Sequence, residues 1–255
     1  MKRELEYFFA ALRFFTRLPV PRWVGHTQDQ LDHAARYFPL IGILIGAIGA
    51  GVTELAALAL PVGVAVLLGM AATILATGAF HEDGFADSCD GFGGGWDKAQ
   101  VLMIMKDSRV GSYATLGVGL LLLTKWNALL EIDAAFGPPF LALALVAGHA
   151  VSRLGPTALI YALDYVRDDD SSKSKPLGQR MAGSELAIAA LCGLTPCLLL
   201  PMVDMLVALA AAALATFLAA RYFVRRIGGY TGDCLGATQQ LAELAFYLGL
   251  LCSFT

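Results

Sequence analysis

The sequence predicts an all-α fold, a polytopic integral membrane helix bundle. Hydrophobic residues make up 57% of the 255 residues and charged residues only 15%, whereas roughly 25% are charged in soluble domains. The mean hydropathy is +0.65. Because lipid offers no partners to free backbone groups, the apolar stretches are expected to be helices. We expect one membrane domain over residues 1–255, with about six to seven transmembrane helices and an N-terminal amphipathic helix at the interface.

The amphipathic helix is expected within residues 1–22. Its apolar residues recur at helical spacing, and charges such as Glu6 and Arg13 interrupt the apolar run. These charges distinguish the segment from a cleavable signal peptide. We expect the helix to lie on the membrane surface. The alternative is a helix packed against the bundle.

Several apolar stretches then reach the ~20 residues that cross a bilayer. Pro61 separates the first two, and Pro201 separates the fifth and sixth. The last stretch is short for a complete crossing. The predicted spans are 39–60, 62–80, 110–130, 139–163, 185–201, 203–223 and 241–255.

Basic residues predict the orientation of these spans. They gather before the first span and in the predicted loops 81–109, 164–183 and 224–240, whereas the connections around Pro61 and at 131–138 contain no Lys or Arg. Loops rich in Lys and Arg face the cytoplasm. We therefore expect a multi-pass protein of a bacterial or archaeal cytoplasmic (inner) membrane, with the N-terminus and all three loops in the cytoplasm.

The most informative segment is residues 81–91, HEDGFADSCDG, which holds four carboxylates next to a predicted span. On a helix, Asp83, Asp87 and Asp90 lie on one face, where they repel one another unless a cation lies among them. Oxygen-only ligands favour a hard cation such as Mg²⁺. We expect these three aspartates to bind Mg²⁺, with Glu82 as a further ligand or the general base. His81 is a candidate ligand or base, and its alternative role is structural. The candidate catalytic residues are thus His81, Glu82 and Asp83.

Three basic residues are candidates for binding phosphate. Lys106 and Arg109 are spaced i, i+3 at the predicted cytoplasmic end of a span, where Arg can bind phosphate oxygens bidentately. Their alternative role is to anchor the span by the positive-inside rule. Arg153 lies inside a predicted span, which makes it a functional candidate by default. A structural ion pair is its alternative role.

Glycine-rich segments accompany these charges. Gly93 and Gly94 follow the acidic motif, and the segment 228–237 reads GGYTGDCLGA. Gly232 and Asp233 stand there at a predicted helix start, where backbone amides favour anions. We expect the three glycines to allow close approach of a phosphate. Asp233 either completes the metal site or caps the helix.

Four segments together resemble the adenosylcobinamide-GDP ribazoletransferase family, also called cobalamin (5′-phosphate) synthase. The resemblance runs from the first helix to near the C-terminus, although the 164–183 loop matches no motif of the family closely. It implies a Mg²⁺-dependent membrane enzyme that joins adenosylcobinamide-GDP to α-ribazole or α-ribazole 5′-phosphate. GMP is released, and adenosylcobalamin or its phosphate forms. The four segments are FFAALRFFTRLPVP, HEDGFADSCDGFGG, KDSRVGSYA and GGYTGDCLGA.

Two alternative functions are a CDP-alcohol phosphotransferase and a cation transporter. Residues 87–91 share the DxxDG start of CDP-alcohol phosphotransferases, but the later acids of that motif are missing after Gly91. A cation transporter would require acids deep in several spans, whereas these acids cluster at one edge. The expected partners are the two substrates and the lipid bilayer, together with a homo-oligomer and other cobalamin-assembly enzymes. No nucleic acid is expected.

Overall fold

The computed structural model describes residues 2–167 and 181–252, and these residues form helices without any β-strand. An isolated bridge joins Tyr165 to Tyr230. The predicted all-α class is therefore confirmed. Short 3₁₀ turns, η1 (Ala35–Tyr37) and η2 (Thr195–Leu199), accompany the helices. The helices are α1 (Lys2–Phe15), α2 (Gln28–Ala34), α3 (Phe38–Ala57), α4 (Val62–Thr77), α5 (Phe80–Gly94), α6 (Lys98–Ile104), α7 (Ser112–Phe136), α8 (Pro138–Ala162), α9 (Gly183–Leu194), α10 (Met202–Ile227) and α11 (Gly232–Leu250).

Four helical segments of the described chain are long and apolar enough to cross a membrane: Gln28–Ala57, Ser112–Phe136, Pro138–Ala162 and Met202–Ile227. The pair α4 and α5 would make a fifth, but it is bent by 88°. The structure thus supports a multi-pass membrane protein, whereas the predicted count of six to seven spans is not confirmed. One reason is that α9 has only 12 residues. Another is that α11 carries buried polar side chains along its length.

Helices occupy much of the chain that was predicted as loop. Helices α5 and α6 cover most of 81–109. Within 224–240, α10 continues to Ile227, and Thr231 caps α11 by accepting a hydrogen bond from Cys234 N. Only residues 228–231 connect α10 to α11. Helix α11 therefore begins well before residue 241, where the last predicted span starts. Of the third predicted loop, 168–180 lies outside the described residues.

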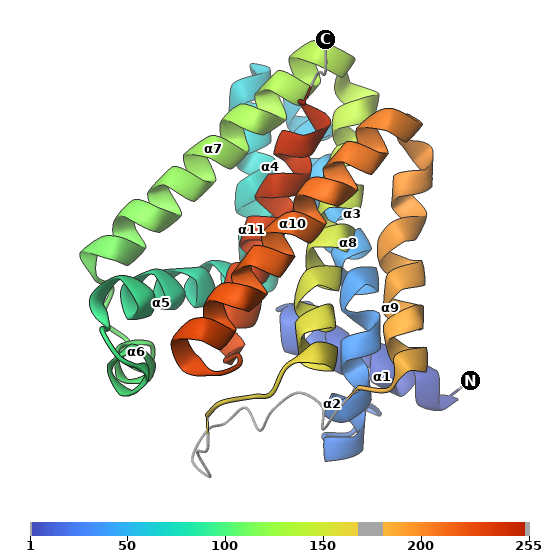
Figure 1. The fold of residues 1–255 in the computed structure, drawn as a ribbon. Helices are drawn as coiled ribbons and strands as arrows, with labels where there is room; N and C mark the ends of the chain where they lie inside the picture. Colours follow the sequence, from blue (N-terminus) through green and yellow to red (C-terminus); the bar gives the residue numbers. More distant parts are fainter. Residues whose placement is uncertain (1, 168–180, 253–255) are drawn as a thin grey trace.

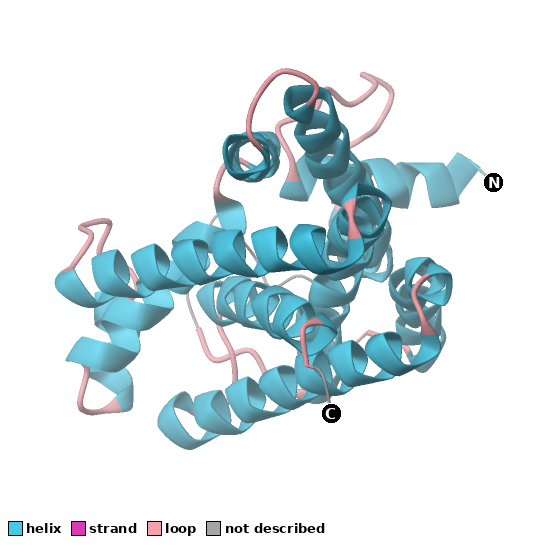
Figure 2. Ribbon diagram, turned by 90° about the horizontal axis from the view of Figure 1, so that it is seen from above, coloured by secondary structure: helices cyan, strands magenta, loops and turns pink. Residues whose placement is uncertain are grey.

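The two ends of the bundle differ, as Figure 1 shows: α1, α2, α5 and α6 lie at one end and the C-terminus at the other. Helix α5 runs across its end of the bundle, and Figure 2 shows the same helices from above, at 90° to the first view. The corner between α4 and α5 contains Gly78 (φ 70°) and Ala79 (φ 59°), both in the left-handed region. We treat the acidic helix α5 as lying outside the spanning helices because of this turn.

Helix α1 is amphipathic, as predicted, but its apolar face covers protein. Leu12 and Phe15 are buried in one hydrophobic cluster with Phe38 of α3, and Tyr7 is buried against the His33 ring of α2. The backbone N–H of Arg17, just after the helix, donates to the carbonyl oxygen of Ala76 at 2.8 Å. The apolar face of α1 therefore packs on the bundle, and the segment after it ties the N-terminal part of the chain to the α4–α5 corner, whereas the predicted position on the membrane surface stays a prediction.

The bundle encloses a network of polar side chains centred on Glu243 of α11, which is only 1% exposed. Lys125 of α7 lies 3.1 Å from Glu243 Oε1, and His149 of α8 lies 3.6 Å from Oε2. Gln239 Nε2 also donates to Oε2 at 2.7 Å. Three helices thus contribute to one buried charged centre, which needs every partner because low dielectric makes unpaired charge costly.

A second glutamine extends this network to α5. Gln240 accepts a hydrogen bond from Lys125 Nζ at 2.8 Å and donates to Glu82 Oε1 at 2.9 Å. Arg153 of α8 donates to the carbonyl oxygen of His149 at 2.8 Å. The network therefore connects the centre of the bundle with the acidic helix at its end.

We predict that Lys125→Met lowers the free energy of unfolding by about 3–5 kcal/mol, because removing one member of a buried ion pair leaves the other uncompensated. Thr124→Ala is the control, since the Thr124 hydroxyl is exposed and bonds only within its own helix, to Leu120 O. Unfolding of the detergent-solubilised proteins by heat or denaturant measures the difference. Equal stability of both variants would show that the pair contributes little.

Candidate active site

The site forms where α5 and α11 cross at very short distance. A Cβ on Gly84 would lie 3.1 Å from Cα of Asp233, and a Cβ on Gly236 would lie 3.1 Å from Cα of Gly84. Small residues allow helices to approach this closely. The crossing brings Asp83 and Asp87 of α5 towards Asp233 in the first turn of α11.

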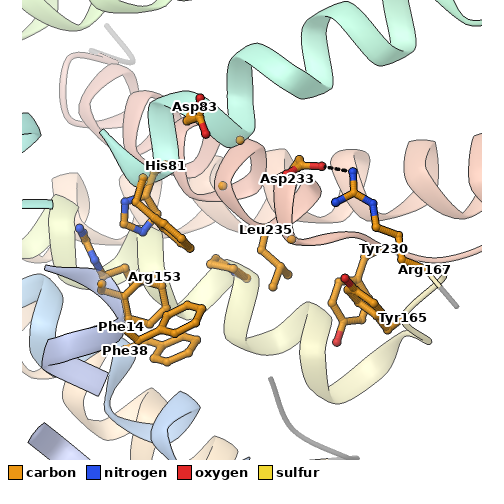
Figure 3. Close-up of a pocket in the computed structure, with 16 residues that line it drawn as sticks. Phe14, Phe38, His81, Asp83, Arg153, Tyr165, Arg167, Tyr230, Asp233 and Leu235 are labelled. Carbon is orange, nitrogen blue, oxygen red and sulfur yellow. Dashed lines mark hydrogen bonds and ion pairs between the residues drawn. The ribbon is translucent and has the colours of Figure 1, made fainter. Parts of the chain in front are cut away.

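A pocket of about 320 Å³ opens beside this crossing. Figure 3 shows Asp83 and Asp233 on one side, Arg167 with Tyr165 and Tyr230 at one end, and His81 with Arg153 at the other. Phenylalanines from α1, α3 and α5 line the second end. The pocket thus joins an acidic and basic part to an aromatic part.

Three aspartates influence one another at the crossing. Burial and then the charges of Asp233 and Asp83 raise the pKa of Asp87 to about 7, while Arg167 opposes the shift. An added cation would relieve this repulsion, and carboxylates alone suit Mg²⁺. Within the described residues, however, no three His, Cys, Asp or Glu side chains are arranged closely enough to hold a metal. The donor chemistry therefore fits Mg²⁺, but the carboxylates must move together to chelate it.

Asp233 is paired with Arg167, which follows α8. An Arg167 Nη donates to Asp233 Oδ2 at 2.7 Å, and Arg167 Nε is buried without a hydrogen-bond partner among the described residues. Backbone bonds from Tyr230 N to Asp164 O and from Val166 N to Tyr230 O, both 3.0 Å, hold the two chain segments together. Arg167 is thereby placed beside the acids with a donor to spare.

Two predicted acidic ligands have other roles. Glu82 faces the buried network through Gln240, because adjacent helix residues point about 100° apart. Asp90 accepts hydrogen bonds from Gly111 N at 2.6 Å and Ala114 N at 2.9 Å, so it caps the start of α7. Neither residue lines the pocket. The predicted acidic ligands thus have different roles: Asp83 lines the pocket, Glu82 joins the buried network, and Asp90 caps α7.

The structure does not bring four of the predicted phosphate-binding residues to the pocket. The Arg109 side chain is 87% exposed and pairs with Asp107, and Lys106 lies in the same exposed turn. A Cβ on Gly93 would meet the Tyr113 ring, and one on Gly94 would meet Ile104. These glycines permit helix packing near α6 and α7, and Lys106 and Arg109 lie on the surface. Proximity in the sequence to the acidic motif was therefore misleading.

Five of the six remaining predicted residues line the pocket, and Asp87 does not: the five are His81, Asp83, Arg153, Gly232 and Asp233. His81 is 4% exposed and stacks on Phe15, with ring centroids 5.7 Å apart. Its burial lowers the pKa of the imidazole well below the usual range. Gly232 has open space around its Cα, which leaves room for a ligand.

Sequence reasoning missed Arg167, the tyrosines and the phenylalanines of the pocket. Arg167 was visible only as one of several basic residues in a polar loop. The aromatic residues belong to apolar stretches, where nothing in the pattern separates a pocket wall from a core. Their convergence depends on the packing of α1 against α3 and α5.

Comparisons with known proteins identify the family of the chain. A model of the cobalamin-5-phosphate synthase family matches residues 7–251. The adenosylcobinamide-GDP ribazoletransferase of Shewanella frigidimarina (strain NCIMB 400) is 50% identical over 249 residues, which is 98% of this chain and 95% of that protein. The proteins of that name from Shewanella halifaxensis (strain HAW-EB4) and Shewanella oneidensis are 46% and 45% identical, over 98% of this chain and 96% and 95% of theirs. No solved structure matches. The chain belongs to the cobalamin-5-phosphate synthase family.

Proposed function

We propose that this protein is an adenosylcobinamide-GDP ribazoletransferase. It joins adenosylcobinamide-GDP to α-ribazole or α-ribazole 5′-phosphate, releases GMP, and forms adenosylcobalamin or its phosphate. The observation that carries the proposal is the pocket in which Asp83, Asp233 and Arg167 meet at the α5–α11 crossing. Family membership favours this reaction over a CDP-alcohol phosphotransferase or a cation transporter.

The reaction is a phosphoryl transfer. A ribose hydroxyl of the ribazole attacks the phosphorus attached to cobinamide, a new P–O bond forms, and the P–O bond to GMP breaks. Catalysis of this kind depends on positioning and on stabilising negative charge. We expect Asp83, Asp87 and Asp233 to hold Mg²⁺, which would supply charge neutralisation at the phosphates.

Arg167 would hold a phosphate oxygen beside the acids. Its buried Nε has no partner in the described chain, and charge-assisted bonds from Arg to phosphate are among the stronger hydrogen bonds. The pair with Asp233 keeps the guanidinium in place until substrate arrives. We place the pocket on the cytoplasmic side because basic residues concentrate at that end of the bundle.

We predict that Asp83→Asn and Asp233→Asn each reduce kcat at least 100-fold, since each removes a charge needed beside the transferring phosphate. Asp107→Asn is the matched control, because Asp107 pairs with Arg109 on the surface outside the pocket. GMP release by purified protein in lipid vesicles, followed by chromatography, gives the rates. Near-normal turnover of both pocket variants would contradict the assignment.

Removal of divalent metal should abolish turnover reversibly. EDTA is expected to stop GMP release, and added Mg²⁺ is expected to restore it, because oxygen ligands and phosphates together bind this ion. Calcium in place of magnesium serves as the control for non-specific charge screening. Full activity in EDTA after extensive dialysis would show that the acids act without a metal.

The helix crossing gives a further prediction. In Gly236→Val the new Cβ would lie 3.0 Å from the carbonyl oxygen of His81 and 3.1 Å from Cα of Gly84, so α5 and α11 must separate. We expect activity to fall at least tenfold, because small misplacements of catalytic groups are costly. Gly119→Val makes the same change in another helix, where a Cβ meets nothing within 4 Å. Equal activity of both variants would mean that the crossing tolerates separation.

A further inference from the structure

We propose that the aromatic end of the pocket binds the base of α-ribazole, with Arg153 donating a hydrogen bond to its free ring nitrogen. The inference rests on the proposed function, since it assigns one of the two substrates to one part of the same pocket. It gives the N-terminal helix α1 a role in substrate binding.

The aromatic end is built from three helices that are distant in sequence. Phe14 and Phe15 come from α1, Phe38 from α3 and Phe80 from α5, and all four line the pocket. Ring centroids lie 4.0 Å apart for Phe15 and Phe38 and 5.4 Å apart for Phe14 and Phe80. Such edge-to-face clusters accommodate another planar aromatic ring.

Arg153 supplies an unused polar atom at this end. It is only 2% exposed, and its Nε is buried without a hydrogen-bond partner among the described residues. Figure 3 shows Arg153 at the end where His81, Phe14 and Phe38 lie, away from Arg167. A buried donor of this kind is costly unless a ligand satisfies it. In the proposed complex, an acceptor atom on an otherwise apolar ring supplies this partner.

The chemistry of the two substrates decides which ring fits. The dimethylbenzimidazole of α-ribazole has an apolar body and one free acceptor nitrogen. The guanine of adenosylcobinamide-GDP carries several N–H donors, and phenylalanine rings cannot accept their hydrogen bonds as carbonyl or carboxylate oxygens would. Leaving such donors buried and unpaired would weaken binding strongly.

The size of the pocket excludes the corrin ring of the other substrate. Its volume is about 320 Å³, near the lower limit of roughly 300–1,000 Å³ for small-ligand sites. A riboside fits this space, whereas a corrin ring with its side chains does not. With the base beside Arg153, the ribose hydroxyl extends towards Asp83 and Asp233, and adenosylcobinamide-GDP approaches from outside with its phosphates towards Arg167.

The first test compares Phe14→Ala with Phe9→Ala. Both residues are partly exposed phenylalanines of α1, but Phe9 contacts Trp23 and does not line the pocket. We expect Phe14→Ala to raise the KM for α-ribazole 5′-phosphate about tenfold, as for the loss of one aromatic contact, while the KM for adenosylcobinamide-GDP changes less than about twofold. Phe9→Ala should change neither KM. A rise confined to the KM for adenosylcobinamide-GDP would assign guanine to the pocket and overturn the proposal.

The second test changes the ligand and leaves the protein intact. An indole analogue of α-ribazole replaces the free ring nitrogen with C–H and should bind the wild-type protein about tenfold more weakly, because one charge-assisted hydrogen bond is lost. Equilibrium dialysis of the protein in lipid vesicles, with Mg²⁺ present and adenosylcobinamide-GDP absent, measures the affinities for α-ribazole and for the indole analogue. Equal affinities, or no binding of α-ribazole at millimolar concentration, would overturn the inference. Binding without turnover would instead contradict the proposed reaction and leave the assignment of the base standing.

Discussion

The arrangement of the site depends on the close contact between α5 and α11. Gly84 and Gly236 bring the two backbones so near that a Cβ on either would touch the other helix. Asp233 stands in the first turn of α11 and Asp83 next to Gly84, so the contact sets the separation of their carboxylates. The 88° bend between α4 and α5 turns α5 across the end of the bundle and makes this crossing possible.

Helix α5 separates two polar environments, one open to solvent and the other buried. Asp83 lines a pocket open to solvent, whereas Glu82, its neighbour in sequence, faces a buried network through Gln240. In the pocket, charge is available to a ligand. In the network, Glu243 and its partners satisfy one another. Their mutual attraction offsets the free energy of desolvation only while the helices keep these side chains in contact.

Much of the fold was predictable from the sequence, because apolar stretches and breaks at proline indicate membrane helices directly. The site was predictable where a residue's chemistry was unusual for its surroundings, as with Asp83, Arg153 and Asp233. Arg109 lies on the surface outside the pocket, because a cation near an acidic motif in sequence need not face it in space. Phe14 could not be found, since a pocket wall and a core have the same apolar pattern until the packing is known.

The buried network has a consequence for how the protein is made. Lys125 and Arg153 lie in α7 and α8, which are synthesised before α11, and Glu243, whose negative charge acts on both cations, belongs to α11. Each cation is costly to hold in lipid without its partner. During biogenesis the two helices must therefore keep their charges near water, or in contact with other proteins, until the C-terminal helix docks between them.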